Sequence, residues 1–241
     1  MEGATPVTAS TWERVLPDTP LWSIERKDAR GFSLRSVAVE LRDGGLAVVS
    51  PIRDLDRDAH AALAALGPVR FLVAPNHFHH LGLAAWRERH AEARVVCSPG
   101  ARPRLYRKAH LEPDPLEALS VALPPAVHVL VPPGLKNGEL WLRLRTPDWC
   151  VWVVSDAFFN IPVRPRGALG LFCRLTGTAP GLRIGGTFLT LAVGDRQAYR
   201  AWLQRRLDED RPLALVPGHG DILIADDLAT RLAALATGRL R

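Results

Sequence analysis

The sequence predicts an α/β layered sandwich built as a single domain. Short apolar runs with the two-residue periodicity of strands alternate along the chain with longer stretches that have helical spacing. The 241 residues are enough for one domain with a well-buried core, and 47% hydrophobic with 23% charged residues is the composition of a folded protein. We therefore expect one domain over residues 1–241, in which residues 1–20 form an N-terminal extension.

Strands and helices alternate in the first half of the chain. In the segment 32–41 apolar and polar residues alternate, but the phase slips by one position at Ser36, which is typical of a β-bulge. Asp43, Gly44 and Gly45 then supply a hairpin turn. The expected strands are 21–25, 32–41, 46–50, 69–74 and 93–97, and the expected helices are 58–66, 84–92 and, interrupted by a proline, 98–108.

The second half continues the same alternation. The segment 195–209 has the apolar face of an amphipathic helix, and Asp226 and Asp227 lie near the positive end of a closing helix. Glycine and proline are frequent in 161–192, so we expect an irregular loop there that either covers a site or forms a flap. The expected strands are 127–131, 139–145, 150–154 and 213–216, and the expected helices are 195–209 and 225–237.

The charge of the chain does not indicate a nucleic-acid partner. The net charge is +6, yet the 31 basic residues are scattered among acids and do not form the clusters or modules that bind phosphates. We therefore expect no specific nucleic-acid binding and a small-molecule substrate.

The cysteines and the apolar segments limit the compartment and the kinds of site. Cys97, Cys150 and Cys173 lie far apart and form no C-x-x-C pair, which argues against a disulfide framework and a thiolate zinc site. We expect all three to be buried apolar residues. The N-terminus has no apolar signal region, and no apolar stretch approaches the roughly 18 residues of a membrane span. The sequence predicts a cytoplasmic protein with no membrane partner.

The strongest functional signal is a loop at 75–82 that carries His77, His79 and His80. It follows an apolar strand and precedes a helix, and loops at the carboxyl ends of strands are where open α/β sheets place their sites. Imidazole binds zinc, iron, copper and nickel. The alternative interpretation is a polar loop that caps the helix, with the imidazoles bonded to the backbone.

Two further strand ends carry ligand-type residues: Asp156 follows 151–154, and a Pro-Gly-His-Gly-Asp turn at 217–221 follows 214–216. This order resembles the metallo-β-lactamase superfamily. There an H-x-H-x-D-H loop, a P-G-H turn, a strand-terminal Asp and a late G-H turn bring ligands to the edge of a four-layer αββα sandwich, usually around two metals. The resemblance extends from about Phe32 to the C-terminus and looks like a bacterial branch with a degenerate H-x-H-x-D-H motif. It implies the αββα fold.

The chain departs from the family pattern at the first metal position. Pro75 stands where the first His of the motif belongs, and Leu135 stands where the P-G-H histidine belongs. Of the first-position ligands only His77 and the shared Asp156 remain. The resemblance therefore implies the loss of one of the two metals.

The second metal position retains more of its ligands. His80, Asp156 and His219 match the family's ligands, and His79 offers nitrogen where the family has a carboxylate. A dinuclear site also normally draws on several carboxylates, and only Asp156 is clearly placed. We expect one divalent metal bound by these four residues, with zinc as first choice and iron or manganese as alternatives.

The resemblance implies hydrolysis by a metal-activated water of an ester, thioester, lactone, amide or phosphoester. His77 would then be free to act as general acid or base or to bind an anionic group, and Asp221 would orient His219. Arg164 and Arg166 are weak candidates for substrate binding, since exposed arginines more often form a solvated face.

Two alternatives remain open. The missing ligands are compatible with a non-catalytic binding or structural protein that retains the fold and a degenerate metal site. They weigh against an iron-dependent redox protein of the diiron type.

Overall fold

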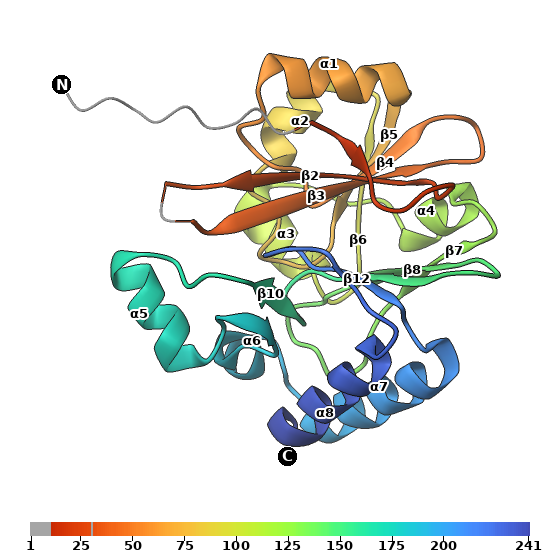
Figure 1. Cartoon of the computed structure of the whole chain (residues 1–241). Coiled ribbons are helices and arrows are strands. Elements are labelled where there is room, and N and C mark those ends of the chain that lie inside the picture. Colours follow the sequence, from red (N-terminus) through yellow and green to blue (C-terminus); the bar gives the residue numbers. More distant parts are fainter. Residues whose placement is uncertain (1–10, 30) are drawn as a thin grey trace.

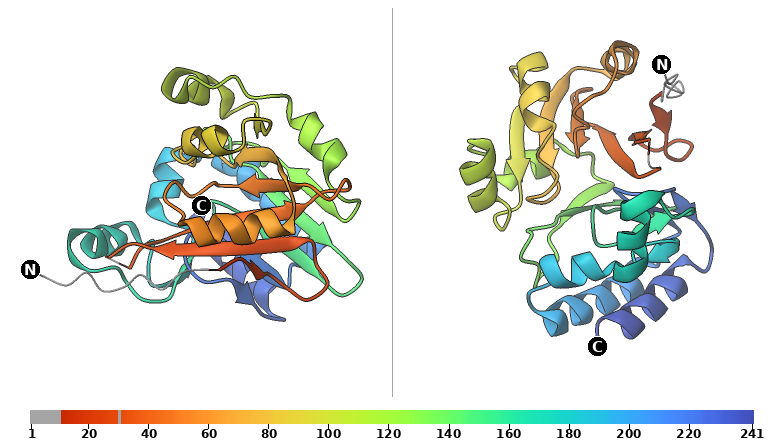
Figure 2. Two further views of the ribbon diagram at one scale, coloured as in Figure 1. Left: turned by 90° about the horizontal axis from the view of Figure 1, so that it is seen from above. Right: turned by 90° about the vertical axis from the view of Figure 1, so that its left-hand side faces the viewer.

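The computed structural model describes residues 11–29 and 31–241 and has the predicted four-layer αββα arrangement. Two sheets face each other, and helices cover the outer face of each sheet (Figure 1, Figure 2). Among the described helices, none is both long enough and apolar enough to cross a membrane.

The first sheet is mixed. In order across the sheet it consists of β1 (Glu13–Arg14), β2 (Leu21–Lys27), β3 (Ser33–Glu40), β4 (Leu46–Val49), β5 (Val69–Ala74) and β6 (Arg94–Cys97). Neighbours from β1 to β4 are antiparallel, and β4, β5 and β6 are parallel. The parallel part needs crossover helices, so α1 (Arg57–Leu66) and α2 (Leu83–Arg89) follow β4 and β5. Together with α3 (Arg102–Ala109) they cover the outer face.

The second sheet begins at β13 (Leu223–Ile224) and continues through β12 (Ala214–Val216), β9 (Cys150–Val153), β8 (Trp141–Arg145) and β7 (Val127–Leu130). The neighbours β12 and β9 are parallel, so their carboxyl ends lie side by side. Helices α7 (Arg196–Asp210) and α8 (Leu228–Arg239) cover the outer face of this sheet (Figure 1). Helix α4 (Leu116–Ala122) connects the two halves, and its Leu119 enters the core between the sheets.

Apolar residues fill each of the three interlayer spaces. The central cluster, which includes Val39, Val73 and Val153, lies between the sheets. A second cluster packs β3, β4 and β5 against α1 and α2 around Trp86, and a third packs β8 and β9 against α7 and α8 around Trp152. Strands in the middle of such a sandwich are buried on both faces. The three cysteines are buried in these clusters and unpaired, as predicted.

The predicted bulge at Ser36 is wrong. The register of β3 with β2 runs without interruption from Leu21 opposite Val39 to Lys27 opposite Ser33. The polar residue is tolerated because its hydroxyl donates to the Ser50 carbonyl at 2.6 Å and accepts from the Ile52 amide at 3.0 Å. Because β3 is buried on both faces, its residues need not alternate strictly between apolar and polar. A shift in that alternation therefore does not indicate a bulge.

The predicted irregular loop at 161–192 is also wrong, because this segment is largely ordered into short elements. Strand β10 (Phe159–Ile161) pairs with β11 (Gly181–Arg183), and the segment also forms α5 (Gly167–Thr176) and α6 (Gly186–Leu191). Its glycines and prolines mark the boundaries of these elements, as Gly177 does at the left-handed end of α5.

Two smaller predictions also need correction. The proline expected to interrupt a helix at 98–108 lies in the first turn of α3, where its missing N–H is not needed. The predicted N-terminal extension lies partly outside the described residues, and its described part contains β1 and the buried Trp12.

Candidate metal centre

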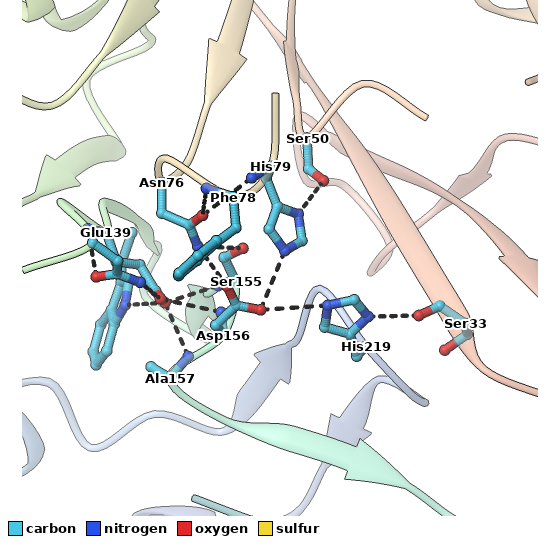
Figure 3. Close-up of polar contacts among 12 residues, drawn as sticks. Ser33, Ser50, Asn76, Phe78, His79, Glu139, Ser155, Asp156, Ala157 and His219 are labelled. Carbon is cyan, nitrogen blue, oxygen red and sulfur yellow. Dashed lines mark hydrogen bonds and ion pairs between the residues drawn. The ribbon is translucent and has the colours of Figure 1, made fainter. Parts of the chain in front are cut away.

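Three ligand-type side chains converge at the carboxyl ends of three strands. His79 follows β5 of the first sheet, whereas Asp156 and His219 follow β9 and β12 of the second sheet. The Nε2 atom of His79 lies 3.2 Å from Asp156 Oδ1, and the Nε2 atom of His219 lies 3.4 Å from the same oxygen (Figure 3). One ligand atom from each residue lies within 4.8 Å of the other two. Two imidazoles from different sheet ends thus meet at one carboxylate oxygen.

The other nitrogen of each ring is held from behind. His219 Nδ1 donates to the Ser33 carbonyl at 2.6 Å, and His79 Nδ1 lies 2.8 Å from the Ser50 hydroxyl. A ring that donates through Nδ1 carries, when neutral, a free lone pair on Nε2. Phe159 stacks on the His219 ring with a centroid distance of 5.5 Å, which further fixes the ring plane. Such outer contacts are the usual means of orienting metal-binding histidines.

Asn76 couples the histidine loop to Asp156. Its side-chain amide donates to Asp156 Oδ2 at 2.8 Å, while its Oδ1 accepts from the backbone amides of Phe78 and His79. The loop is folded by this Asx-type turn, which is a common role for asparagine. Burial acts to raise the pKa of Asp156, but the neighbouring His79 and His219 outweigh it and lower that pKa well below its ordinary value. Asp156 is therefore an ionised carboxylate.

Glu139 holds the backbone of residues 155–157 in place, a role that was not predicted from the sequence. Its Oε1 atom accepts from the Ser155 and Ala157 amides, each at 3.1 Å, and from Trp141 Nε1 at 3.0 Å. Its Oε2 atom accepts from the Asp156 amide at 3.2 Å. Burial, and then the charge of Asp156, raise the pKa of Glu139 to about 7. This fully buried carboxylate fixes the backbone that presents Asp156.

His80 lies outside the group that the structure brings together. Its Nδ1 atom donates to the His77 carbonyl at 2.9 Å. Such a bond to the backbone is expected if the loop is a polar helix cap, which was the alternative interpretation. Three of the four residues expected to bind metal are therefore adjacent, and the assignment of His80 stays a prediction that this contact does not favour.

The structure also separates His77 from the centre. Its ring packs edge-on against Phe78, and burial, followed by the charges of Arg104 and His80, lowers its pKa. Neither His77 nor His80 lines the cavity described below. The catalytic role expected for His77 has no supporting contact.

The other predicted supporting residues take different places. The Asp221 carboxylate lies 3.7 Å from Lys27 Nζ, and the partner of His219 Nδ1 is the Ser33 carbonyl instead. A backbone carbonyl thus takes the place that was expected for Asp221. The pattern of side chains in a sequence does not indicate such a backbone partner. Arg164 and Arg166 are exposed and do not line the cavity.

A cavity of about 590 Å³ opens over the centre, and His79, Asp156 and His219 form its polar floor. Its remaining walls come from the end of β2 and the residue after it, the start of β3, the segment after β4, the histidine loop, β10 and α6. Helix α6 therefore supplies the cover that the sequence suggested for part of 161–192.

The donor set fits a divalent metal ion. Two imidazole nitrogens and one carboxylate oxygen form the protein ligands of known catalytic zinc sites and of mononuclear ferrous sites, and both kinds retain open positions for water and substrate. Both Nδ1 atoms have partners, so the Nε2 atoms remain for the ion. At the two positions where the sequence resemblance implied missing ligands, the Pro75 carbonyl accepts from the Leu140 amide and Leu135 packs against the apolar core.

No family model and no curated protein matches this sequence. The structure, however, is similar to solved structures over nearly its whole length. A metallo-β-lactamase from Pontibacter korlensis is 14% identical with a TM-score of 0.61, and the match covers 95% of this chain and all of the other. A metallo-β-lactamase from Erythrobacter litoralis is 12% identical with a TM-score of 0.63, over 97% of this chain and 99% of the other.

A variant of a flavo di-iron protein from Thermotoga maritima is also similar, at 12% identity and a TM-score of 0.62, over 96% of this chain and 61% of the other. The resemblance noted in the sequence is thus confirmed at the level of the fold. The protein has the metallo-β-lactamase fold.

Proposed function

We propose that the protein is a mononuclear metal-dependent hydrolase whose metal is held by His79, Asp156 and His219. One observation carries this proposal: two Nε2 atoms meet one ionised carboxylate oxygen at the floor of a cavity, at 3.2 and 3.4 Å. Similarity to metallo-β-lactamases and to a flavo di-iron protein supports a metal site on this fold. Zinc is the first choice, and iron or manganese is an alternative.

A divalent ion at this position supplies a water of lowered pKa and polarises a carbonyl or phosphoryl oxygen of the substrate. The residues of the chain provide the remaining parts. Asp156 offsets the charge of the ion, and the contacts of Ser33 and Ser50 hold both rings in position. The side chains of His79, Asp156 and His219 are only 7%, 16% and 11% exposed, and electrostatic interactions are stronger in such partly desolvated surroundings.

The test compares wild type with Asp156→Ala, both purified without chelator. We expect the wild type to contain metal and to hydrolyse at least one member of a panel of 4-nitrophenyl esters, a thioester, a lactone and a phosphoester. The variant should lose the metal and the turnover together. Metal-free wild type, or turnover that survives in the Asp156→Ala variant, contradicts the proposal.

The alternative is a non-catalytic metal-binding or structural protein. It is favoured by the absence of ligand side chains at Pro75 and Leu135 and by the backbone bonding of His80. The two proposals differ in one outcome: bound metal without turnover on every class of the panel supports the alternative.

A further inference from the structure

We propose that the cavity selects a neutral, lipophilic substrate, namely a carboxylic ester or thioester with an apolar acyl group. This inference rests on the proposed function and narrows its substrate class. It follows from the walls, the rim and the charge of the cavity.

The walls are formed by large apolar side chains from separate parts of the chain. Aromatic rings are prominent among them, and two of these rings lie over a proposed ligand: Phe32 and Phe159 contact the His219 ring at centroid distances of 4.7 and 5.5 Å. The apolar wall residues include Phe32, Leu34, Ile52, Phe78, Phe159 and Phe188. A pocket with such walls and a few polar groups at the floor binds carbon-rich ligands.

The rim continues the apolar surface outward. Leu81 of the histidine loop and Leu191 of α6 both line the cavity, yet they are 70% and 59% exposed. The apolar surface at the opening is thus contributed by two segments that lie far apart in the sequence. A chain longer than the cavity would still find apolar contacts at its opening, and exposed apolar patches at a cavity mouth typically mark ligand contact.

The side chains of the cavity carry no excess of positive charge. Among the described lining residues, the cations are Arg26 and Arg53, and the acids are Asp28, Asp54 and, at the floor, Asp156. A phosphoester dianion is usually bound by a cluster of cationic groups with charge-assisted hydrogen bonds. The described lining lacks such an excess of cations, so it favours a neutral group over a phosphoester.

The size of the cavity sets the expected effect of chain length. A volume of about 590 Å³ lies within the range that holds drug-sized ligands. Each methylene moved from water to an apolar wall contributes about 0.8 kcal/mol, which corresponds to about fourfold in kcat/KM.

In the proposed reaction a bond forms between the water oxygen and the acyl carbon. The bond from that carbon to the leaving oxygen or sulfur breaks, and a water proton passes to the leaving group.

The experiment measures kcat/KM of the metal-loaded wild type for 4-nitrophenyl acetate, butyrate, hexanoate and octanoate, with 4-nitrophenyl phosphate beside them. We expect an increase of about fourfold per methylene until the cavity is filled. The phosphate should remain at background. A flat or falling dependence on chain length, or a preference for the phosphate, overturns the inference.

Three matched leucine variants locate the effect. Leu81→Arg and Leu191→Arg each place a charge at the rim. Leu175→Arg instead alters a leucine of α5 that is at least as exposed, at 77%, and that does not line the cavity. The two rim variants should lose at least tenfold in kcat/KM for the octanoate and little for the acetate. The Leu175→Arg variant should match the wild type for both esters. Equal losses of kcat/KM in all three variants would show that the effect does not come from the rim of the cavity.

A binding measurement separates this inference from the proposed function. In metal-depleted protein, Nile red should bind and be displaced more effectively by 1-octanol than by 1-butanol, and this displacement should weaken in Leu191→Arg. If no ester is hydrolysed but this pattern holds, the hydrolase proposal fails and the apolar cavity stands. If esters are hydrolysed while the probe does not bind, the lipophilic inference is wrong.

Discussion

At the scale of single residues, the candidate centre depends on atoms that never touch a metal. The Ser50 hydroxyl lies 2.8 Å from His79 Nδ1, and the Ser33 carbonyl lies 2.6 Å from His219 Nδ1. These contacts fix which nitrogen of each ring faces Asp156. The hydroxyl can be removed by mutation, whereas the carbonyl cannot.

Replacing Ser50 with Ala should therefore weaken the metal site without removing it. Loss of a contact behind a metal-binding histidine typically costs about 10- to 100-fold in metal affinity. Competition titration with a chromophoric chelator measures this change. Ser120→Ala, which removes an exposed hydroxyl bonded only within α4, serves as the control. An unchanged affinity in Ser50→Ala would contradict the proposed role of this contact in orienting His79 for metal binding.

Glu139 makes a prediction about pH. Burial raises its pKa to about 7 in the fold, against roughly 4.3 in an unfolded chain. The folded state holds this proton more tightly than the unfolded state does, so protonation of Glu139 stabilises the fold. This stabilisation is complete below about pH 4.3 and is lost as the pH rises through about 7. Glu139→Gln has no such titration. In metal-free protein, the unfolding free energy of wild type minus variant should fall by about 3 kcal/mol between pH 4.5 and 7.5.

Urea unfolding at several pH values, after removal of metal, measures this difference. Asp156 has the opposite tendency, since its lowered pKa gives stability that is lost as the pH falls. Because that pKa lies far below pH 4.5, Asp156 stays ionised in both proteins over the range measured. A wild-type-minus-variant difference that stays constant with pH would contradict the account of Glu139.

The three converging side chains of the candidate centre could be predicted from the sequence, whereas the groups that support them could not. His79, Asp156 and His219 stand directly after apolar strands, and strand ends of this kind gather at a sheet edge. The role of His80 depends on which way a ring points, and spacing in the sequence does not determine this. Ser33 acts through its carbonyl, and Glu139 lies two residues before β8 with no motif around it. Such contacts arise only from the packing of distant segments.

At the scale of elements, the turn that presents His219 depends on a glycine. Gly220 has φ +90°, and a Cβ atom there would lie 2.0 Å from the Asn160 carbonyl oxygen. The Gly220 amide donates to Ser33 Oγ at 2.7 Å, and the Gly220 carbonyl accepts from the buried Arg35 at 2.8 Å. The turn is thus wedged between β3 and β10.

Gly220→Ala should combine a stability loss of about 1–3 kcal/mol with weaker metal binding, because both the strained φ and the close approach oppose a side chain. Thermal unfolding and chelator titration measure the two effects. Gly238→Ala is the matched control, since a Cβ at Gly238 meets nothing within 4 Å. A wild-type metal affinity in Gly220→Ala would contradict the proposed dependence of His219 on this turn.

The same scale explains which elements the sequence could predict. The amphipathic α7 and the apolar strands β5, β9 and β12 were predicted close to their observed bounds. The segment 161–192 was not, because its two helices are short and bounded by glycines that resemble loop signals. Among the described residues, it also exposes large apolar side chains such as Leu171 and Leu175, which obscure a helical pattern.

At the scale of the whole molecule, the centre joins the two halves of the sandwich. His79 comes from the first sheet, and Asp156 and His219 come from the second. Because the three donors meet only in the folded chain, an ion that binds them stabilises the fold by mass action. This stabilisation amounts to about 2.7 kcal/mol when the free ion is at 100 times its Kd.

Removal of metal should therefore lower the unfolding temperature of the wild type. Adding back zinc should restore it, and Asp156→Ala should respond to neither treatment. Differential scanning calorimetry measures the shift, with magnesium added back as the control ion. An equal shift in the wild type and in Asp156→Ala would mean that the ion acts elsewhere.

The most direct test of the central claim compares neighbouring histidines. Metal content should be measured by mass spectrometry on protein purified without chelator or added metal, for wild type, His79→Ala and His80→Ala. We expect close to one metal per chain in the wild type and in His80→Ala, and little in His79→Ala. A metal-free wild type, or a His80→Ala variant that loses the metal while His79→Ala keeps it, would show that His79, Asp156 and His219 do not form the metal site.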